Sequence, residues 1–201
     1  MAFNQVALIT IPSVTIWIDS GVYLEDPVLR NVSVTALYIR CKDNVDSIDA
    51  STADLPVKVR SVGFFFVRGY IQVTGLQFID TANGPDFSGS IYQLLAEQSG
   101  YVAVNKCKFA NDNRNSSSMA VYAGGTTQCH IYGNTYFYRQ NIAIWAKLMG
   151  TILISSIIGS QNTTGARCDD GVIRREPPTG FADIQTKVTG CGLYITKGTT
   201  L

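Results

Sequence analysis

The sequence has little charge, one histidine, and none of the runs of Ala, Glu, Lys and Leu that favour helices. Its 201 residues include 16 Lys or Arg and 15 Asp or Glu, which gives a formal net charge of +1. Nucleic-acid-binding proteins normally carry a basic excess on one face or segment, so we expect no nucleic acid among the partners. The 5 Cys form no CxxC pair and have no histidine cluster beside them, so the sequence predicts no zinc site and no cofactor.

The sequence also lacks clear export and membrane signals. Its first residues, MAFNQ, do not contain the basic region of a signal peptide. Residues 141–159 are nearly all apolar, but Lys147 and Gly150 lie at their centre, and a charge there is costly in a bilayer. We therefore expect two strands around a turn in this stretch, and no membrane partner.

What the sequence contains instead is a ten-residue pattern that recurs. Residues 69–78 read GYIQVTGLQF and residues 100–109 read GYVAVNKCKF. Weaker versions occur at 127–136, 150–159 and 184–193, and residues 30–39 fit as well. A recurrence every ~20–50 residues is typical of solenoids, in which each unit buries its apolar face against its neighbours.

The pattern alternates as a strand with one buried face does. With the first residue counted as zero, positions two and four are apolar and predict inward-facing side chains. These positions are Val32 and Val34, Ile71 and Val73, Val102 and Val104, Cys129 and Ile131, and Ile152 and Ile154. Position six is small or Gly in nearly every unit, as a bend requires, and a second short strand follows it.

A third strand precedes several units, at residues 94–96 (LLA), 121–123 (VYA) and 144–146 (IWA). Three short strands per repeat predict an all-β fold, a single-stranded parallel β-helix of about six to seven coils. The 201 residues are expected to form one domain. Residues 1–30 would be an opening coil, an N-terminal cap or an attachment segment, residues 30–197 the repeat coils, and residues 160–183 an inserted loop. An antiparallel β-sandwich with chance similarity between its strands is the alternative.

The third strand is apolar on both faces. If Leu94, Val121 and Ile144 point inward, the alternate row points outward; we assign Phe64, Leu95, Tyr122 and Trp145 to that row. A large exposed apolar row usually marks an interface, so these four residues are predicted to contact neighbouring chains. The alternative is that the strand is inverted and the row belongs to the core.

The positions of the cysteines and of one charged segment can also be compared with the repeat pattern. Cys107, Cys129 and Cys191 fall at apolar positions of the pattern, whereas Cys41 and Cys168 lie outside it, and a disulfide between these two stays open. The expected loop at 160–183 gathers much of the charge and is either a solvated excursion or a contact with a partner protein or a glycan. Its candidate contact residues are Arg167, Asp169, Asp170, Arg174 and Arg175.

Irregular coils of this kind resemble the right-handed, pectin-lyase-like β-helices, over about residues 14–197. The short chain, the missing signal peptide and the outer apolar row look most like virion proteins of tailed bacteriophages. That resemblance implies a non-enzymatic tail fibre, tailspike or surface decoration, made in the host cytoplasm and incorporated in the virion. It also implies a homotrimer that contacts other virion proteins, with a host surface polysaccharide as a further candidate partner. No family-defining motif is matched, so no functional residue is carried over.

Two other functions stay open at this point: a polysaccharide depolymerase and a secreted bacterial adhesin. Glycan-cleaving β-helices need paired carboxylates about 5–9.5 Å apart. Asp80 and Asp112 come nearest to one position on adjacent repeats, but both stand where loops begin, and Asp is an ordinary turn residue there. His130 is predicted to face outward beside Tyr132 and is a weak candidate for a general base. The sequence thus leans away from an enzyme.

Overall fold

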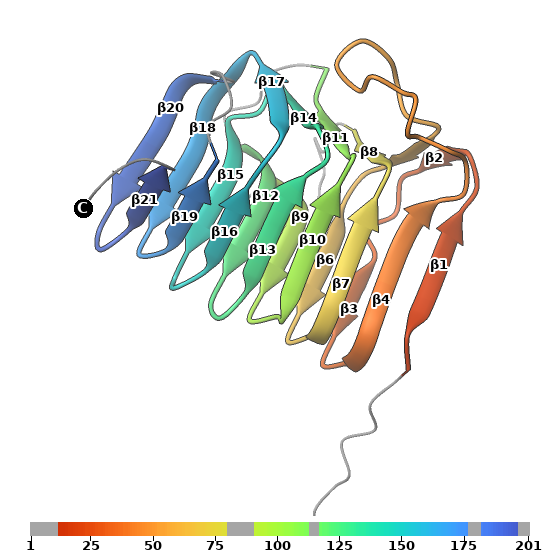
Figure 1. Cartoon of the computed structure of the whole chain (residues 1–201), viewed down its shortest axis with the longest axis horizontal. Helices are drawn as coiled ribbons and strands as arrows, with labels where there is room; N and C mark the ends of the chain where they lie inside the picture. Colours follow the sequence, from red (N-terminus) through yellow and green to blue (C-terminus); the bar gives the residue numbers. More distant parts are fainter. Residues whose placement is uncertain (1–11, 80–90, 113–116, 177–181, 197–201) are drawn as a thin grey trace, which may run out of the picture.

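The computed structural model describes residues 12–79, 91–112, 117–176 and 182–196. This part of the chain is a parallel β-helix, in which three parallel sheets wrap around one core (Figure 1). In the first six coils the chain passes through the first, second and third sheet in turn, and neighbouring strands in a sheet come from successive coils. The predicted fold class is therefore confirmed.

The strands are assigned to the sheets as follows. Within the described residues the first sheet contains β1 (Val14–Ile18), β4 (Ser33–Cys41), β7 (Arg68–Thr74), β10 (Tyr101–Asn105), β13 (Gln128–Tyr132), β16 (Thr151–Ile154), β19 (Val172–Arg175) and β21 (Leu193–Thr196). The second sheet contains β2 (Gly21–Tyr23), β5 (Val57–Val59), β8 (Leu76–Phe78), β11 (Lys108–Ala110), β14 (Thr135–Tyr138) and β17 (Ile157–Ser160). The third sheet contains β3 (Val28–Arg30), β6 (Val62–Phe65), β9 (Ile91–Glu97), β12 (Ser118–Gly124), β15 (Ile142–Lys147), β18 (Asn162–Asp169) and β20 (Ala182–Thr189).

Equivalent side chains of successive coils stack in columns inside the helix. Ile71 is in register with Val102, and Val102 with Cys129, all three at most 3% exposed. The core also holds a ladder of parallel phenyl rings, Phe78 on Phe109 at 4.5 Å and Phe109 on Phe137 at 5.1 Å between centroids. Stacking like over like is how a solenoid buries apolar area that no single coil buries alone.

The corner between the first and second sheets needs a left-handed backbone residue. Gly75, Lys106, Gly133 and Ser156 occupy this corner with φ between 50° and 71°, which confirms the predicted bend at position six. Gly75 suits the conformation because it has no Cβ, and an added Cβ would lie 2.8 Å from a Val45 methyl carbon.

Buried amides fill the corner between the second and third sheets. Gln93, Asn111, Gln140 and Asn162 are at most 2% exposed. Gln93 donates to the Asn111 side chain at 3.1 Å, and Gln140 donates to Gln93 at 2.9 Å. Asn162 accepts from the Gln140 backbone N–H at 2.9 Å and donates to the Phe137 carbonyl. The ladder satisfies backbone groups that the turn would otherwise leave buried without partners.

Two of the predicted repeat alignments are wrong. Leu37, not Val32, is in register with Ile71, because β4 is nine residues long and its register shifts between Ser33 and Ala36. Residues 184–193 are not a repeat unit of the first sheet either: they contain most of β20, a turn at Gly190 and the first residue of β21. Cys191 accordingly lies in an exposed turn and not in the core.

The predicted inserted loop at 160–183 is also wrong. Its described residues form β18 and β19, which continue the third and first sheets. The long described insertion is instead residues 42–56, between β4 and β5. Charge had suggested a loop, but in a solenoid the outward positions of regular strands carry charge equally well.

The fold shows the state of the cysteines and the structure of the apolar stretch at 141–159. All five thiols are free, so no disulfide joins Cys41 and Cys168. Burial raises the pKa of Cys107 and Cys129 to about 12, so both behave as apolar core residues. Residues 142–159 contain β15, β16 and most of β17, and the described part of the chain has no helix long and apolar enough to cross a membrane.

Candidate interaction surface at the N-terminal end

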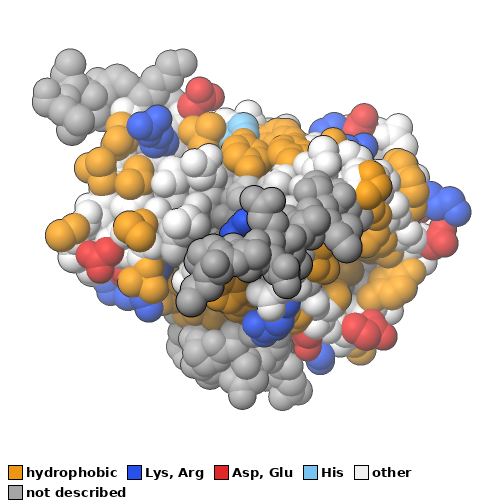
Figure 2. All heavy atoms as spheres, turned by 90° about the horizontal axis from the view of Figure 1, so that it is seen from below, with side chains coloured by type: hydrophobic (Ala, Val, Ile, Leu, Met, Phe, Trp, Pro, Cys, Tyr) orange, Lys and Arg blue, Asp and Glu red, His pale blue; other side chains and the backbone are white. Residues whose placement is uncertain are grey.

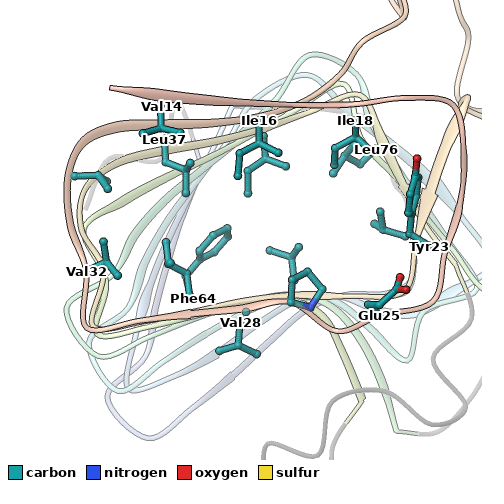
Figure 3. Close-up of a pocket in the computed structure, with 17 residues that line it drawn as sticks. Val14, Ile16, Ile18, Tyr23, Glu25, Val28, Val32, Leu37, Phe64 and Leu76 are labelled. Carbon is teal, nitrogen blue, oxygen red and sulfur yellow. The ribbon is translucent and has the colours of Figure 1, made fainter. Parts of the chain in front are cut away.

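The N-terminal end of the β-helix is an open apolar cavity of about 580 Å³. Figure 3 shows Val14, Ile16 and Ile18 of β1 pointing into it from one side and Phe64 from the opposite side. Leu37 and Leu76 lie beneath them, and Glu25 and Tyr23 stand at one edge. The cavity therefore lies at the N-terminal end of the core. It is lined by the same columns of inward side chains that pack against a neighbouring coil on both sides further along the chain.

The strand order explains why this end is open. Within the described residues, β1, β2 and β3 are each the outermost strand of their sheet and pair with one neighbour only. The alternation in β1 turns Val14, Ile16 and Ile18 inward, in register with Leu37, Ile39 and Cys41. An apolar end whose outermost described strands have a neighbour on one side only is a surface that normally has to be covered.

Large hydrophobic side chains are also exposed on the outside of this end. Six of the thirteen exposed large hydrophobic residues in the described part of the chain fall within residues 16–28, and three of these six line the cavity. We call the other three the N-terminal collar: Trp17 at 58%, Val22 at 60% and Leu24 at 58% exposure. Trp17 is in register with Arg40 on the outer face of the first sheet, and Val22 is in register with Lys58 on the second sheet. Exposed apolar residues clustered in this way usually mark a contact with another molecule.

Paired charges surround the collar. Lys42 and Asp19 form an ion pair at 2.8 Å, and the Arg60 guanidinium binds the Asp26 carboxylate. Figure 2 shows hydrophobic side chains beside acidic and basic ones at the end that carries β1. An apolar centre with a polar, charge-paired rim is the composition expected of a protein interface.

The predicted outward row lies on the outer face of the third sheet but is already buried. Leu95, Tyr122 and Trp145 are in register with one another and are 4%, 7% and 7% exposed. With Tyr92, Met119 and Ile142 they form a hydrophobic cluster separate from the core. Desolvation, followed by the charge of Glu97, raises the pKa of Tyr122. The row points outward as predicted, yet within one chain it offers little area to a second copy.

Trp145 is held on that face by polar neighbours as well as by packing. Its ring meets Tyr122 edge-on at 5.5 Å, and its indole N–H donates to Asp169 at 3.1 Å. Arg167 lies 4.6 Å above the ring and forms an ion pair with Asp169 at 2.7 Å. Trp145 and Arg167 are therefore structural residues of the outer cluster.

Phe64 does not belong to the outer row. It is 1% exposed, lies in the core and lines the N-terminal cavity. Phe64 is in register with Ala96, and the residue in register with Leu95 is Gly63. The prediction was displaced by one residue, and a slip of one moves a side chain to the opposite face of a sheet.

The weak catalytic candidates are not brought together as a site. Asp80 lies outside the described residues. Asp112 is exposed, and its backbone carbonyl accepts a hydrogen bond from Arg139. His130 faces outward as predicted; its Nε2 lies 2.9 Å from the Ser155 hydroxyl, and its ring packs against Tyr132 at 4.7 Å. Burial lowers the pKa of His130, so the ring is neutral near pH 7. These contacts describe a surface network on the first sheet.

The remaining charged candidates are spread over strands and turns. Asp170 is at a turn, where its carboxylate accepts from the Cys191 backbone N–H at 2.7 Å. Arg174 is exposed on β19, whereas Arg175 occupies an inward position and donates to the Tyr194 hydroxyl at 3.1 Å. In the described part of the chain no group of three or more His, Cys, Asp or Glu residues is placed to hold a metal ion.

Sequence reasoning did not identify the collar as a surface. The signal was present in residues 14–24, where apolar residues occupy both alternate sets of positions, just as in the third strand. Comparisons with protein-family models, with curated proteins and with solved structures found no match for the chain. The N-terminal surface is therefore the feature of the molecule that bears most directly on function.

Proposed function

We propose that this chain is a non-enzymatic structural protein of a tailed-bacteriophage particle, a rigid β-helix that forms part of a fibre, spike or surface decoration. The observation that carries the proposal is the N-terminal end, where Trp17, Val22 and Leu24 are more than half exposed. A solenoid of stacked coils is stiff, and exposed apolar residues confined to one end suit attachment there. The association proposed is a homotrimer whose contacts are made by the collar.

The outer face of the first sheet supports a further part of the proposal, contact with a host surface polysaccharide. Tyr70 stacks on Tyr101 at 5.6 Å, and the Gln72 amide bridges Arg40 and Tyr132 with hydrogen bonds of 2.7 Å each. Rings and planar polar groups on one face provide apolar area together with hydrogen-bonding groups, which sugars require. This contact is secondary to the assembly role.

Assembly is tested by light scattering on the purified full chain at micromolar concentration. A trimer is expected for the parent protein, and Trp17→Asp and Leu24→Asp should give monomers with unchanged circular dichroism. Leu153→Asp is the matched control, because Leu153 is an exposed apolar residue on the first sheet far from the collar. A parent chain that stays monomeric, or collar variants that stay trimeric, would overturn the proposal.

A further inference from the structure

The first sheet carries positive charge that no acid in its own strands balances. Its eight described strands, from β1 to β21, form one side of the β-helix (Figure 1). These strands contain four arginines and one histidine but no Asp or Glu. The second sheet differs, because its Lys58 and Lys108 both pair with Asp54 of the insertion at 42–56, at 2.7 and 3.0 Å. An arginine on the outer face of the first sheet has no such partner in its own sheet.

Arg40 of β4 is held on this outer face by neutral groups. Its Nη2 donates to the Gln72 side-chain oxygen at 2.7 Å, and its Cζ lies 4.5 Å from the centre of the Tyr38 ring. In the described part of the chain Arg40 forms no ion pair with a carboxylate, and its Nη1 has no hydrogen-bond partner. Its Nε is the unpaired nitrogen that is buried, so Nη1 is open to solvent. A guanidinium fixed by neutral groups, with one amino group open, is prepared to bind an anion.

Neutral hydrogen-bonding groups continue from Arg40 along the sheet. The Gln72 amide donates to the Tyr132 hydroxyl at 2.7 Å, and Tyr70 stacks on Tyr101 at 5.6 Å. Burial raises the pKa of Tyr70 and Tyr101, so their hydroxyls stay protonated and do not repel an anion. From β4 to β13 the strands cover three spacings of ~4.8 Å, or about 14 Å along the helix axis. The result is a flat, polar surface with one uncompensated charge.

We infer that this surface binds an acidic sugar chain, with a sugar carboxylate on the Arg40 guanidinium and sugar hydroxyls on the neighbouring phenol and amide groups. The inference rests on the polysaccharide contact proposed above and names the class of glycan, one whose sugars carry carboxylates. The carboxylate supplies the charge that Arg40 lacks, and such complementarity selects between ligands of similar shape. Hydroxyls and an amide spread over a flat face suit a sugar chain, because it presents many hydroxyls of its own.

The sugar surface and the N-terminal collar lie on different sides of Arg40. Trp17 of the collar is in register with Arg40 on the preceding coil, β1. The Arg40 guanidinium contacts Gln72 on the following coil, β7. The two contacts can therefore be tested with separate variants.

The test measures binding to the full chain by calorimetry with two matched sugars, the hexamers of β-linked mannuronic acid and of β-linked mannose. They differ only in a carboxylate in place of a hydroxymethyl group on each sugar. The parent chain should bind the acidic hexamer about tenfold more tightly, the ratio expected of one charged hydrogen bond. Hexaglutamate, which carries the same number of carboxylates on a peptide, should bind no more tightly than the neutral sugar.

Two arginine variants locate the charge that selects the acidic sugar. Arg40→Gln should remove most of the preference, and Arg40→Lys should keep part of it, because an ammonium retains the charge without the planar fork. Arg174→Gln is the matched control: Arg174 is an exposed arginine on β19 of the same sheet, and the variant loses the same charge. It should keep the full preference. Circular dichroism checks that each variant is folded.

Four outcomes would overturn the inference. They are equal binding of the two sugars by the parent chain, an unchanged preference in folded Arg40→Gln, an equal loss in Arg174→Gln, and binding of hexaglutamate as tight as that of the acidic sugar. If both sugars bind equally, the polysaccharide contact stands and only the carboxylate is wrong. If neither sugar binds, the inference fails while the trimer, which light scattering on Trp17→Asp measures, is unaffected.

Discussion

The two ends of this β-helix close in different ways. At the N-terminal end the two inner columns of the first sheet finish with Val14 and Ile16, both apolar and facing a cavity. At the C-terminal end the same columns pass through Ile173 to Tyr194, and through Ile154 to Arg175. The Arg175 guanidinium donates to the Tyr194 hydroxyl at 3.1 Å, so the last coils cover the core with polar groups.

The difference shows two ways in which the outermost described coils of a solenoid can fill their inner columns. Polar residues in an inward column stop the stacking, because a further coil would have to bury them. Apolar residues in the same column leave the stack ready to continue, at the cost of an exposed apolar surface. The N-terminal end is therefore where additional structure is expected.

The largest expected difference in the free energy of unfolding is between a substitution in the middle of the β-helix and one at its open N-terminal end. Phe109→Ala removes the central ring of the phenyl ladder and should lower the free energy of unfolding by about 3–5 kcal/mol. Ile16→Ala should cost about 1 kcal/mol or less, since Ile16 is already 46% exposed. Urea denaturation of both variants measures the difference. A cost for Ile16→Ala as large as that for Phe109→Ala would show that the end is fully covered.

The two tryptophans offer a second, matched comparison. Trp145 is 7% exposed and donates to Asp169, whereas Trp17 is 58% exposed. Trp145→Ala should therefore lower the free energy of unfolding by about 3 kcal/mol, and Trp17→Ala should change it by about 0.5 kcal/mol or less in the monomer. Thermal denaturation at low protein concentration measures both. Equal losses would mean that the outer cluster is as accessible as the collar.

The sequence predicted the architecture well because stacking repeats one pattern many times. The inward columns through Ile71, Val102 and Cys129 were assigned correctly, since position-by-position alternation survives changes in loop length. The prediction from sequence was least reliable where the strands of a coil differ in length from those of the other coils. The extra residues of β4 displaced the first unit by five positions, and the short β6 displaced Phe64 by one.

The candidate site was harder to foresee than the fold. Alternation shows that Leu95, Tyr122 and Trp145 point away from the core, but it cannot show that they are covered within the same chain. Conversely, Trp17 and Leu24 become conspicuous only when the strand order places them at the outermost coil. Burial depends on which coil is terminal, and that information is not local in sequence.

A smaller effect is expected from the insertion at 42–56, which lies in the N-terminal half. Lys58, then Lys108 and Gln77, donate hydrogen bonds to Asp54 at 2.7, 3.0 and 3.1 Å, and they hold the pKa of its carboxyl well below the ordinary value although partial burial opposes this. Asp54→Asn should cost about 1 kcal/mol near pH 7, a modest figure because the Asp54 side chain is 55% exposed.

The pH dependence of that cost follows from the sign of the shift. A carboxyl with a lowered pKa in the folded state stabilises the fold above about pH 4, and the stabilisation is lost as the pH falls below this value. The difference in the free energy of unfolding between the parent chain and Asp54→Asn should therefore narrow on acidification. Urea midpoints measured from about pH 7 to pH 2.5 would show it, and a gap that stays constant would mean that the carboxylate charge is not the cause.

The smallest effect on stability is expected from making the C-terminal end resemble the N-terminal one. Arg175→Leu replaces a half-buried polar contact by an apolar side chain of similar length in a column that already contains Ile131 and Ile154. The Tyr194 hydroxyl is only half-buried and can form a hydrogen bond with water once Arg175 is lost, so the free energy of unfolding should change by about 1 kcal/mol or less. The exposed apolar area at that end should nevertheless increase, and ANS fluorescence should rise with it.

Arg175→Lys, which keeps the charge, is the matched control and should leave the dye signal unchanged. If Arg175→Leu binds no more dye than the parent chain, polar groups in the last inner column are not what closes the C-terminal end, and the contrast between the two ends must come from elsewhere in the terminal coils.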